Sequence, residues 1–309
     1  MNWSKQTKIF SPDGSIDWMF HYAAQVCPIE MDKHIRVYFT TRSKLDNNGN
    51  YQTKVTFLDC DKEDPTKILY IHDKPLLQLG QPGTFDEHGI MMCEVLFHEN
   101  KYWLYYLGWQ RSTVVPYITT LGLALSDDGI NFEKVSEGPI IGLNRFSPFG
   151  VAKASILIEN GEFNMWYSHY NSWINVEGNL RPTYDIRFAK STNGLDWEFN
   201  EDVCISPTHS GEALGAPSVK KIDEIYHMWY GYREKPNKGE NYKMGYAVSK
   251  DKINWDRNDH INVINSSSEG WDSEMVCYPY IMKLDNNLLM FYSGNGYGKE
   301  GFGFCKEIN

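Results

Sequence analysis

Two carboxylates recur at the same place in a repeated sequence pattern. The interval from Glu212 to Glu274 equals the interval from Tyr230 to Tyr292, the aromatic residues that follow them. Two facing carboxylates can cleave or transfer a glycosidic bond, because one protonates the departing oxygen while the other activates water or attacks carbon. We therefore predict that Glu212 and Glu274 form an acid–base pair.

Other side chains near this pair would assist it or contact a ligand. His88 occupies the same column in another copy of the repeat, and Asp272 lies two positions before Glu274, so we expect both to assist. Arginine suits bidentate contacts, asparagine suits paired donor and acceptor contacts, and aromatic rings suit stacking. The predicted ligand-contacting residues are His21, Arg42, Asp86, Glu87, Trp109, Arg145, Lys153, His169, His209, Tyr232, Arg233, Trp271 and Asn295. Each loop acid could instead be a solvated surface residue.

A repeat of roughly sixty residues must position these side chains. Five segments each contain an apolar run, a polar turn and an aromatic run, a pattern typical of a β-hairpin. Their matching aromatic residues recur at nearly constant intervals, and we call them the anchors: Phe39, Tyr106, Tyr167, Tyr230 and Tyr292. Three hairpins are followed by a strand ending in Ser, a turn, and an aromatic residue that opens a further strand. Each unit therefore reads as four antiparallel strands, which at a fixed period are typical of propeller blades.

The two ends of the chain complete one another in this pattern. The segment from Tyr292 to the last residue, Asn309, is long enough for a third strand but not for a fourth. The missing strand matches the N-terminus, because Trp3 precedes Phe39 by nearly the same interval as Trp255 precedes Tyr292. We predict one all-β domain over 1–309, a five-bladed β-propeller with four antiparallel strands per blade. Its expected parts are a closing strand at 3–10, which joins the C-terminal blade, and blades at 20–77, 88–141, 148–205, 212–264 and 273–308.

The composition argues against several classes of function. The net charge of −10 and the lack of a basic run argue against nucleic-acid binding. No run of eighteen apolar residues is present, and the start of the chain lacks the apolar core of a signal peptide, so we expect a cytoplasmic protein without membrane insertion. The six cysteines have no zinc-type spacing, and we expect buried reduced thiols, no metal site and no cofactor. The repeated Trp3, Trp197 and Trp255 should pack between units.

Several segments resemble a known superfamily. GAPSVKKIDEIYHMWYGYR (215–233), GWDSEMVCYPYIM (270–282) and ALSDDGINF (124–132) are similar to segments of five-bladed propeller glycosidases, which include glycoside hydrolase families 32, 43, 62, 68, 117 and 130. The resemblance covers the whole chain at the level of the blades. It implies a propeller fold and activity on a saccharide or glycoconjugate in an axial pocket.

The chain also departs from these families. Residues 26–28, 152–154 and 215–217 correspond to the positions where family 43 typically carries its acids, and none of them is acidic. The acidic set of family 32 is absent too, and Cys93–Glu94 reverses its last pair. We predict a glycoside hydrolase, and two alternatives stay open. The missing acids favour a non-catalytic saccharide-binding propeller, whereas Arg145, Lys153 and Arg233 favour phosphorolysis or transglycosylation.

Overall fold

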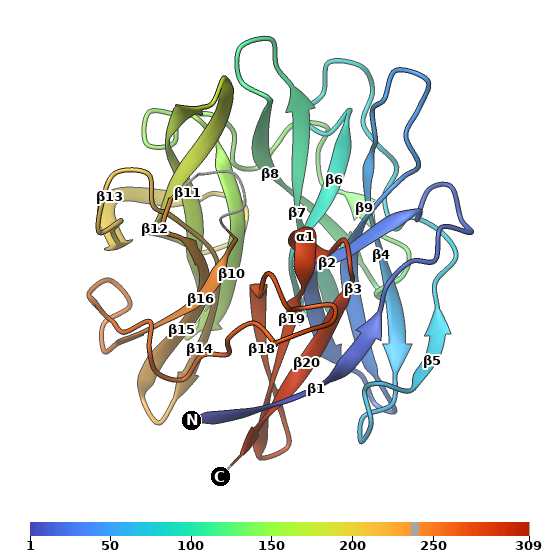
Figure 1. Cartoon of the computed structure of the whole chain (residues 1–309). Coiled ribbons are helices and arrows are strands. Elements are labelled where there is room, and N and C mark those ends of the chain that lie inside the picture. The colour runs from blue at the N-terminus through green and yellow to red at the C-terminus, as the bar shows by residue number, and fades with distance from the viewer. Residues whose placement is uncertain (236–240, 309) are drawn as a thin grey trace.

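The computed structural model describes residues 1–235 and 241–308, and it is an all-β structure (Figure 1). Twenty strands form three sheets, one with four strands and two with eight. Each eight-stranded sheet consists of two four-stranded units joined by a single parallel residue pair, Thr53 with Gly89 in one sheet and Tyr184 with Ala213 in the other. Within the described residues, no sheet closes on itself.

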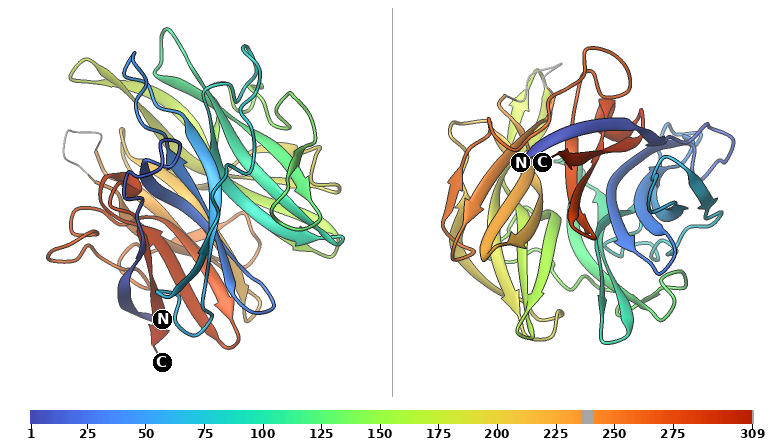
Figure 2. Two further views of the ribbon diagram at one scale, coloured as in Figure 1. Left: turned by 90° about the vertical axis from the view of Figure 1, so that its right-hand side faces the viewer. Right: turned by 90° about the horizontal axis from the view of Figure 1, so that it is seen from below.

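The four-stranded sheet joins the two ends of the chain. Its strand order is β1 (Asn2–Phe10), β20 (Phe302–Ile308), β19 (Asn287–Ser293) and β18 (Cys277–Leu284). Strands β1 and β20 are antiparallel, with Asn2 opposite Ile308 and Lys5 opposite Cys305. The two termini consequently lie close together in both figures of the whole chain (Figures 1 and 2). The pairing expected between the strand around Trp3 and residues 301–308 is therefore present.

One eight-stranded sheet contains the next two units. The first unit comprises β2 (His21–Glu30), β3 (Ile35–Arg42), β4 (Thr53–Cys60) and β5 (Ile68–Ile71). The second unit comprises β6 (Gly89–His98), β7 (Lys101–Arg111), β8 (Tyr117–Ser126) and β9 (Glu133–Lys134). Strand β3, IRVYFTTR, is buried along almost its whole length, because its β-branched and aromatic residues pack on both faces of the sheet.

The other eight-stranded sheet contains two further units. One comprises β10 (Val151–Glu159), β11 (Glu162–Val176), β12 (Asn179–Ser191) and β13 (Glu198–Ile205). The other comprises β14 (Ala213–Ile222), β15 (Ile225–Arg233), β16 (Lys243–Ser249) and β17 (Trp255–Arg257). The only helix among the described residues is the single turn α1 (Asn295–Gly298), between β19 and β20, so no described helix has the length to span a bilayer.

The first strands of the units surround a shared centre. We use this term for β2, β6, β10, β14 and β18, and along this series each strand contacts the next, while β18 also contacts β2. The five anchors lie on the strands that pair with them and are almost completely buried. The sheets therefore present their first strands to the centre and their fourth strands to the outside.

The repeated tryptophans pack between neighbouring units, as predicted. The ring of Trp255 lies 6.1 Å from that of Trp166, and the ring of Trp3 lies 6.1 Å from that of Trp229. Trp197 similarly packs 6.3 Å from Tyr105 of the preceding unit. The prediction for the cysteines is also confirmed, since all six are buried and none forms a disulfide.

Candidate functional site

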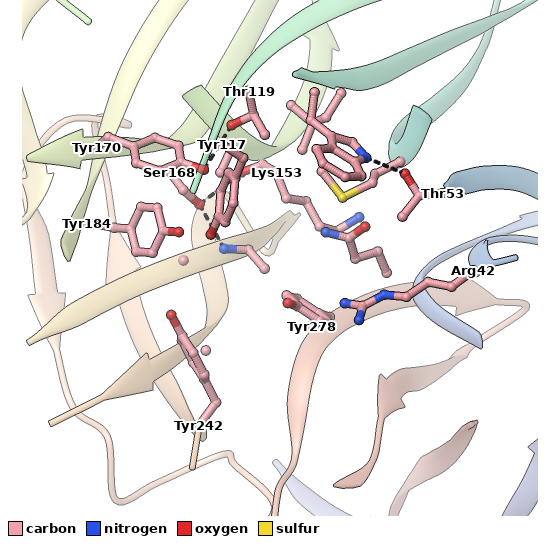
Figure 3. Close-up of a pocket in the computed structure, with 18 of the residues that line it drawn as sticks. Arg42, Thr53, Tyr117, Thr119, Lys153, Ser168, Tyr170, Tyr184, Tyr242 and Tyr278 are labelled. Atoms are coloured by element: carbon pink, nitrogen blue, oxygen red, sulfur yellow. Dashed lines mark hydrogen bonds between the residues drawn. The ribbon is translucent and has the colours of Figure 1, made fainter. Parts of the chain in front are cut away.

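A pocket lies where the first strands converge, with a cavity volume of about 200 Å³ (Figure 3). Each of the five four-stranded units contributes to its wall. The lining residues are Gln25, Arg42, Tyr51, Thr53, Met91, Leu107, Trp109, Tyr117, Thr119, Ala152, Lys153, Ser168, Tyr170, Tyr184, Gly215, Ala216, Gly231, Tyr242 and Tyr278. We call this cavity the axial pocket.

Several first strands reach the axial pocket through a β-bulge. Gln25, Ala216 and Tyr278 lie at register shifts and have left-handed backbone φ angles of 53°, 54° and 53°. Lys153 lies at the corresponding shift in β10. A bulge turns a side chain away from the regular alternation of a strand. These four side chains therefore depart from the strand alternation at the place where each strand lines the pocket.

Tyrosines make up much of the pocket wall. Six of them line the cavity: Tyr51, Tyr117, Tyr170, Tyr184, Tyr242 and Tyr278. The hydroxyl groups of Tyr117, Tyr184, Tyr242 and Tyr278 point toward the same space (Figure 3), and burial raises the pKa of each of these four phenols above its ordinary value. At neutral pH they are therefore uncharged and can donate hydrogen bonds to a ligand.

The charged side chains in the pocket wall are both cationic. The guanidinium of Arg42 lies 3.7 Å from the ring centre of Tyr22 and 4.5 Å from that of Tyr51. Lys153 is only 2% exposed, and its Nζ donates a hydrogen bond to the Cys93 carbonyl at 2.7 Å. Among the described residues that line the pocket, none carries a carboxylate. The pocket is thus locally positive in a protein whose net charge is −10.

Trp109 supplies an apolar ring to the wall and is held in place by the neighbouring unit. Its Nε1 donates to Thr53 Oγ1 at 2.7 Å, and the indole is 8% exposed. His88 lies behind this ring, with ring centres 5.9 Å apart, and its Nδ1 is 3.3 Å from Glu87 Oε1. Of the seventeen predicted site residues, Arg42, Trp109 and Lys153 line the pocket, while His88 and Glu87 lie outside its wall.

The structure places Glu212 outside the axial pocket. Its carboxylate accepts hydrogen bonds from Arg257 at 2.6 and 3.2 Å and from the Thr208 hydroxyl at 3.1 Å. Burial acts to raise the pKa of Glu212, but the hydrogen bonds from Arg257 and Thr208 outweigh it and hold the pKa below its ordinary value. Both carboxylate oxygens of Glu212 are thus hydrogen-bonded outside the pocket wall, and its acid–base role stays a prediction.

Two other predicted acids form the same kind of contact. Asp86 Oδ2 lies 2.6 Å from Lys134 Nζ, and Asp272 Oδ2 lies 2.6 Å from Lys5 Nζ. With Glu212–Arg257 these are the loop-acid ion pairs. In each pair the acid precedes a first strand and the cation lies on the fourth strand of the same unit. In these three units the ion pair therefore fastens the loop to the outer edge of its own sheet, whereas Glu274, at the repeat position of Glu212, takes no part in such a pair.

The remaining candidates near the C-terminal sheet also have structural partners. Glu274 is exposed, and its backbone N–H donates to Asn295 Oδ1 at 2.7 Å. Asn295 Nδ2 in turn donates to the Gly270 carbonyl at 3.0 Å. Trp271 stacks on Tyr292 with ring centres 5.0 Å apart. The structure does not bring Glu274 together with Glu212 in the pocket wall, which departs from the predicted pair.

Three further candidates are exposed at the surface. His21 packs its ring 4.4 Å from that of Phe20, and Arg145 lies 4.6 Å from the ring of Phe146. His209 is also exposed, and its Nδ1 lies 3.2 Å from the Ser210 carbonyl oxygen. None of the three lines the axial pocket.

The last three candidates are buried next to the pocket rather than in its wall. His169 Nδ1 lies 3.0 Å from Asp185 Oδ1. The guanidinium carbon of Arg257 lies 5.5 Å from the ring centre of Tyr232. Arg233 is 6% exposed, donates to the Pro182 carbonyl at 2.9 Å, and lies 5.6 Å from the ring centre of the pocket residue Tyr242. Arg233 therefore adds positive charge behind the pocket wall.

Glu94, on β6, is buried between first strands and was not among the predicted catalytic residues. It is 2% exposed. Its Oε1 accepts a hydrogen bond from the Tyr280 hydroxyl at 2.6 Å and one from the Cys27 thiol at 3.3 Å. These contacts connect β2, β6 and β18. Glu94 is thus occupied in holding three first strands together, and it does not line the pocket.

The pocket tyrosines were not predicted from the sequence, although their spacing carries a signal. Tyr51, Tyr117 and Tyr242 follow the anchors of their units at nearly the same interval. Tyr184 follows its anchor Tyr167 at a longer interval, because the hairpin between β11 and β12 is longer. Tyr51, Tyr117 and Tyr242 lie at or just before the start of a third strand, and Tyr184 lies inside the third strand β12.

Several known proteins are similar to this chain in sequence or in fold. No protein-family model matches the chain. Two Mycobacterium tuberculosis proteins, named uncharacterized protein MT1551 and uncharacterized protein Rv1502, are each 32% identical to it over 307 residues, or 99% of both chains. The 1,2-beta-oligomannan phosphorylase of Thermoanaerobacter sp. is 23% identical over 237 residues, which cover 74% of this chain and 72% of the relative.

Two solved structures with a similar fold are carbohydrate-active enzymes by name. The beta-1,2-mannobiose phosphorylase from Listeria innocua has a TM-score of 0.74 and 14% identity, covering 99% of this chain and 97% of its own. A structure described as a glycoside hydrolase also has a TM-score of 0.74, with 15% identity over 98% of this chain and 91% of its own. At these identities the likeness shows the propeller-type fold.

Proposed function

This chain belongs to the protein family of Mycobacterium tuberculosis MT1551 and Rv1502, and we propose that it binds a saccharide or glycoconjugate in the axial pocket and cleaves or transfers a glycosidic bond there. The observation that carries this proposal is the wall of that pocket. Trp109 and the tyrosines offer ring faces for sugar rings. The tyrosine hydroxyl groups and the Gln25 amide offer hydrogen bonds to sugar hydroxyls. A concave site with aromatic walls and a few convergent polar groups is the usual form of a small-ligand site.

The proposal includes the arrangement of the units. We infer that the five four-stranded units are the blades of a five-bladed propeller, in which β1 completes the last blade. The contacts of β2, β6, β10, β14 and β18 in series, and of β18 with β2, support this reading. Ligands of propellers bind near the central channel, where the first strands meet. The axial pocket occupies that position.

Phosphorolysis is the reaction that the pocket favours over hydrolysis. Hydrolysis by a carboxylate pair needs two acids at the bond, and the described wall residues include none. In phosphorolysis the glycosidic C–O bond breaks, an oxygen of hydrogen phosphate forms the new bond to carbon, and the proton that this phosphate loses goes to the departing oxygen. Arg42 and Lys153 could hold the phosphate, since cations suit this anion. The relative from Thermoanaerobacter sp., itself named a phosphorylase, supports the same direction.

The proposal is tested by turnover with and without phosphate. The purified protein is incubated with aryl glycosides of both anomeric series and with unlabelled disaccharides, and free sugars and sugar phosphates are separated by anion-exchange chromatography. We expect phosphate-dependent release of a sugar phosphate. Release in water alone would instead establish hydrolysis. Saccharide binding without any product, even after long incubation, would establish a non-catalytic binding protein.

A pair of variants assigns any turnover to the axial pocket. Trp109→Ala removes a ring from the wall and should abolish most of the activity. Phe97→Ala removes an aromatic ring that is 58% exposed at the far end of β6 and should leave the activity unchanged. Equal activity of the two variants would place the reaction elsewhere in the molecule.

A further inference from the structure

We propose that the reactant in the axial pocket presents an oxyanion and that Arg42 binds it. The proposal rests on the saccharide function only in that the oxyanion belongs to a reactant of the same pocket. The proposal specifies the charge of the ligand, which the shape of the pocket and the stacking of its aromatic rings do not determine. The oxyanion is either a carboxylate or phosphate group carried by the saccharide or a free inorganic phosphate.

Arg42 is held in place while its donors remain unused. The guanidinium lies between the rings of Tyr22 and Tyr51, at 3.7 and 4.5 Å from their centres. Among residues 1–235 and 241–308 no acceptor takes a hydrogen bond from its nitrogens. Stacking fixes the plane of a guanidinium without occupying the edge that binds carboxylate or phosphate. The guanidinium points toward the same space as Tyr278 (Figure 3), so an anion there would meet preoriented donors.

Lys153 supplies a second cation whose charge is not balanced by an ion pair. Its side chain is 2% exposed, and the Cys93 carbonyl is its hydrogen-bond partner in the described part of the chain. The nearby carboxylate of Glu94 already accepts hydrogen bonds from Tyr280 and Cys27. A buried ammonium without a paired anion is costly, and a bound anion would remove that cost.

The rest of the wall is rich in hydrogen-bond donors. The phenols of Tyr117, Tyr184 and Tyr278 are uncharged at neutral pH and can donate, and burial, which raises their pKa values, favours this uncharged form further. Behind Tyr242, Arg233 adds another positive charge, and its Nε has no hydrogen-bond partner in the described residues. The charged oxygens of a carboxylate or phosphate accept hydrogen bonds, so a wall of donors without a carboxylate complements them.

The test measures binding and does not depend on turnover. Isothermal titration of the full chain compares glucuronate with glucose, a hexose phosphate with its parent hexose, and inorganic phosphate alone. The variants are Arg42→Gln, which removes the charge, and Arg42→Lys, which keeps it without the planar fork. The control is Lys101→Gln. Lys101 is exposed, pairs with Asp127, and begins β7, whereas Trp109 lies near the other end of that strand.

We expect at least one anionic probe to bind tenfold or more tightly than its uncharged counterpart, and Arg42→Gln to remove that difference. The Arg42→Lys variant should retain part of it, and Lys101→Gln all of it. Thermal unfolding of each variant shows whether the fold is retained, and Arg42→Lys keeps the test valid if Arg42→Gln unfolds.

The arms of the experiment separate the sources of the oxyanion. If inorganic phosphate binds through Arg42 and charged and uncharged sugars bind equally, the oxyanion is free phosphate. If charged sugars bind more tightly and phosphate does not compete, the saccharide carries it. Equal binding of every probe, or a preference that survives Arg42→Gln, overturns the inference. A charge preference without turnover would count against the proposed enzymatic function and leave this inference standing.

Discussion

Arg257 Nη2 lies 2.6 Å from Glu212 Oε1, and this contact joins the loop before β14 to β17 at the outer edge of the same unit. The same connection is made by Lys134 with Asp86 and by Lys5 with Asp272. In these three units a loop acid is therefore matched by a cation three strands away in the sheet order. The recurring ion pairs reflect the construction of the units, whereas the axial pocket combines the recurring tyrosines with charged residues, Arg42 and Lys153, that single units contribute.

Glu212→Gln should reduce stability and leave the ligand affinity unchanged. Removing one partner of a buried ion pair typically costs about 3–5 kcal/mol, and we expect about 2 kcal/mol because Arg257 keeps its contact with Asp259 at 2.7 Å. Urea unfolding measures the loss, and titration with a saccharide measures the affinity. Glu274→Gln is the control, since Glu274 is exposed and should change neither quantity. Loss of turnover in Glu212→Gln with unchanged stability would return Glu212 to a catalytic role.

The contribution of Glu212 should disappear at acidic pH. Its pKa in the folded protein lies below the ordinary value of 4.5, because hydrogen bonds from Arg257 outweigh the effect of burial. A lowered folded pKa stabilises the protein above the unfolded pKa, and this stabilisation is lost as the pH falls through the folded value. The difference in unfolding free energy between the wild type and Glu212→Gln should therefore be constant near neutral pH and shrink below about pH 4.5. A difference that grows with acidity would contradict the assignment.

Gly89→Ala should weaken ligand binding from outside the pocket wall. A Cβ at Gly89 would collide with Trp109 Nε1 and Thr53 Oγ1, so the indole would have to leave its hydrogen bond and its place in the wall. We expect roughly a tenfold loss of saccharide affinity. Gly138→Ala is the matched control, because a Cβ there meets nothing within 4 Å. An unchanged affinity in Gly89→Ala would mean that Trp109 does not contact the ligand.

Tyr278→Phe should remove one donor from the pocket while preserving its shape. Tyrosine and phenylalanine are strained equally by the left-handed φ of 53° at this position. A change in affinity would therefore report the loss of the hydroxyl group alone. Loss of a hydrogen bond between neutral groups is worth about 1 kcal/mol, and saccharide affinity should fall roughly fivefold. Tyr70→Phe, on the exposed outer strand β5, should leave the affinity as it is. Calorimetric titration of both variants gives the comparison, and equal affinities would remove Tyr278 from the site.

Deleting residues 1–10 should open the C-terminal sheet. The deletion removes β1, the Lys5–Asp272 pair and the packing of Trp3 on Trp229, and it leaves β20 as an unpaired edge. We expect the midpoint of thermal unfolding to fall by roughly 10 °C and the protein to associate through the exposed edge. Light scattering after size-exclusion chromatography measures the association. A synthetic peptide of residues 2–10 should restore the monomer, and a truncated chain that stays monomeric without it would refute the prediction.

The strand pattern was accessible from the sequence because its signals are local and repeated. The anchors recur at nearly constant spacing, and the turn that follows Ser126 recurs after Ser191 and Ser249, whose hydroxyls accept the N–H three positions later at 3.0, 2.9 and 3.0 Å. Such features depend on neighbours within one hairpin. Strand positions could therefore be read without knowing how the sheets pack.

The site was not accessible by the same reasoning. Glu212 and Arg257 are 45 residues apart, and nothing in the sequence near either one reveals that they meet. Glu212 and Glu274 share a repeat position, yet Glu212 pairs with Arg257 while Glu274 is exposed, because a repeat shows that a position recurs and not which role it has. Arg42 and Lys153 do line the pocket, since each lies at or near the end of a strand that reaches the centre.

The pairing of β1 with β20 also has a consequence for synthesis on the ribosome. Both eight-stranded sheets lie within residues 21–257, so their strands can pair while later parts are still being translated. Strand β1 emerges before all others but meets its partner only after β20 has been made. During this interval Ser4, Lys5, Gln6 and Lys8 keep the waiting segment polar, which protects it from aggregation. The four-stranded sheet consequently cannot be complete until β20 has been made.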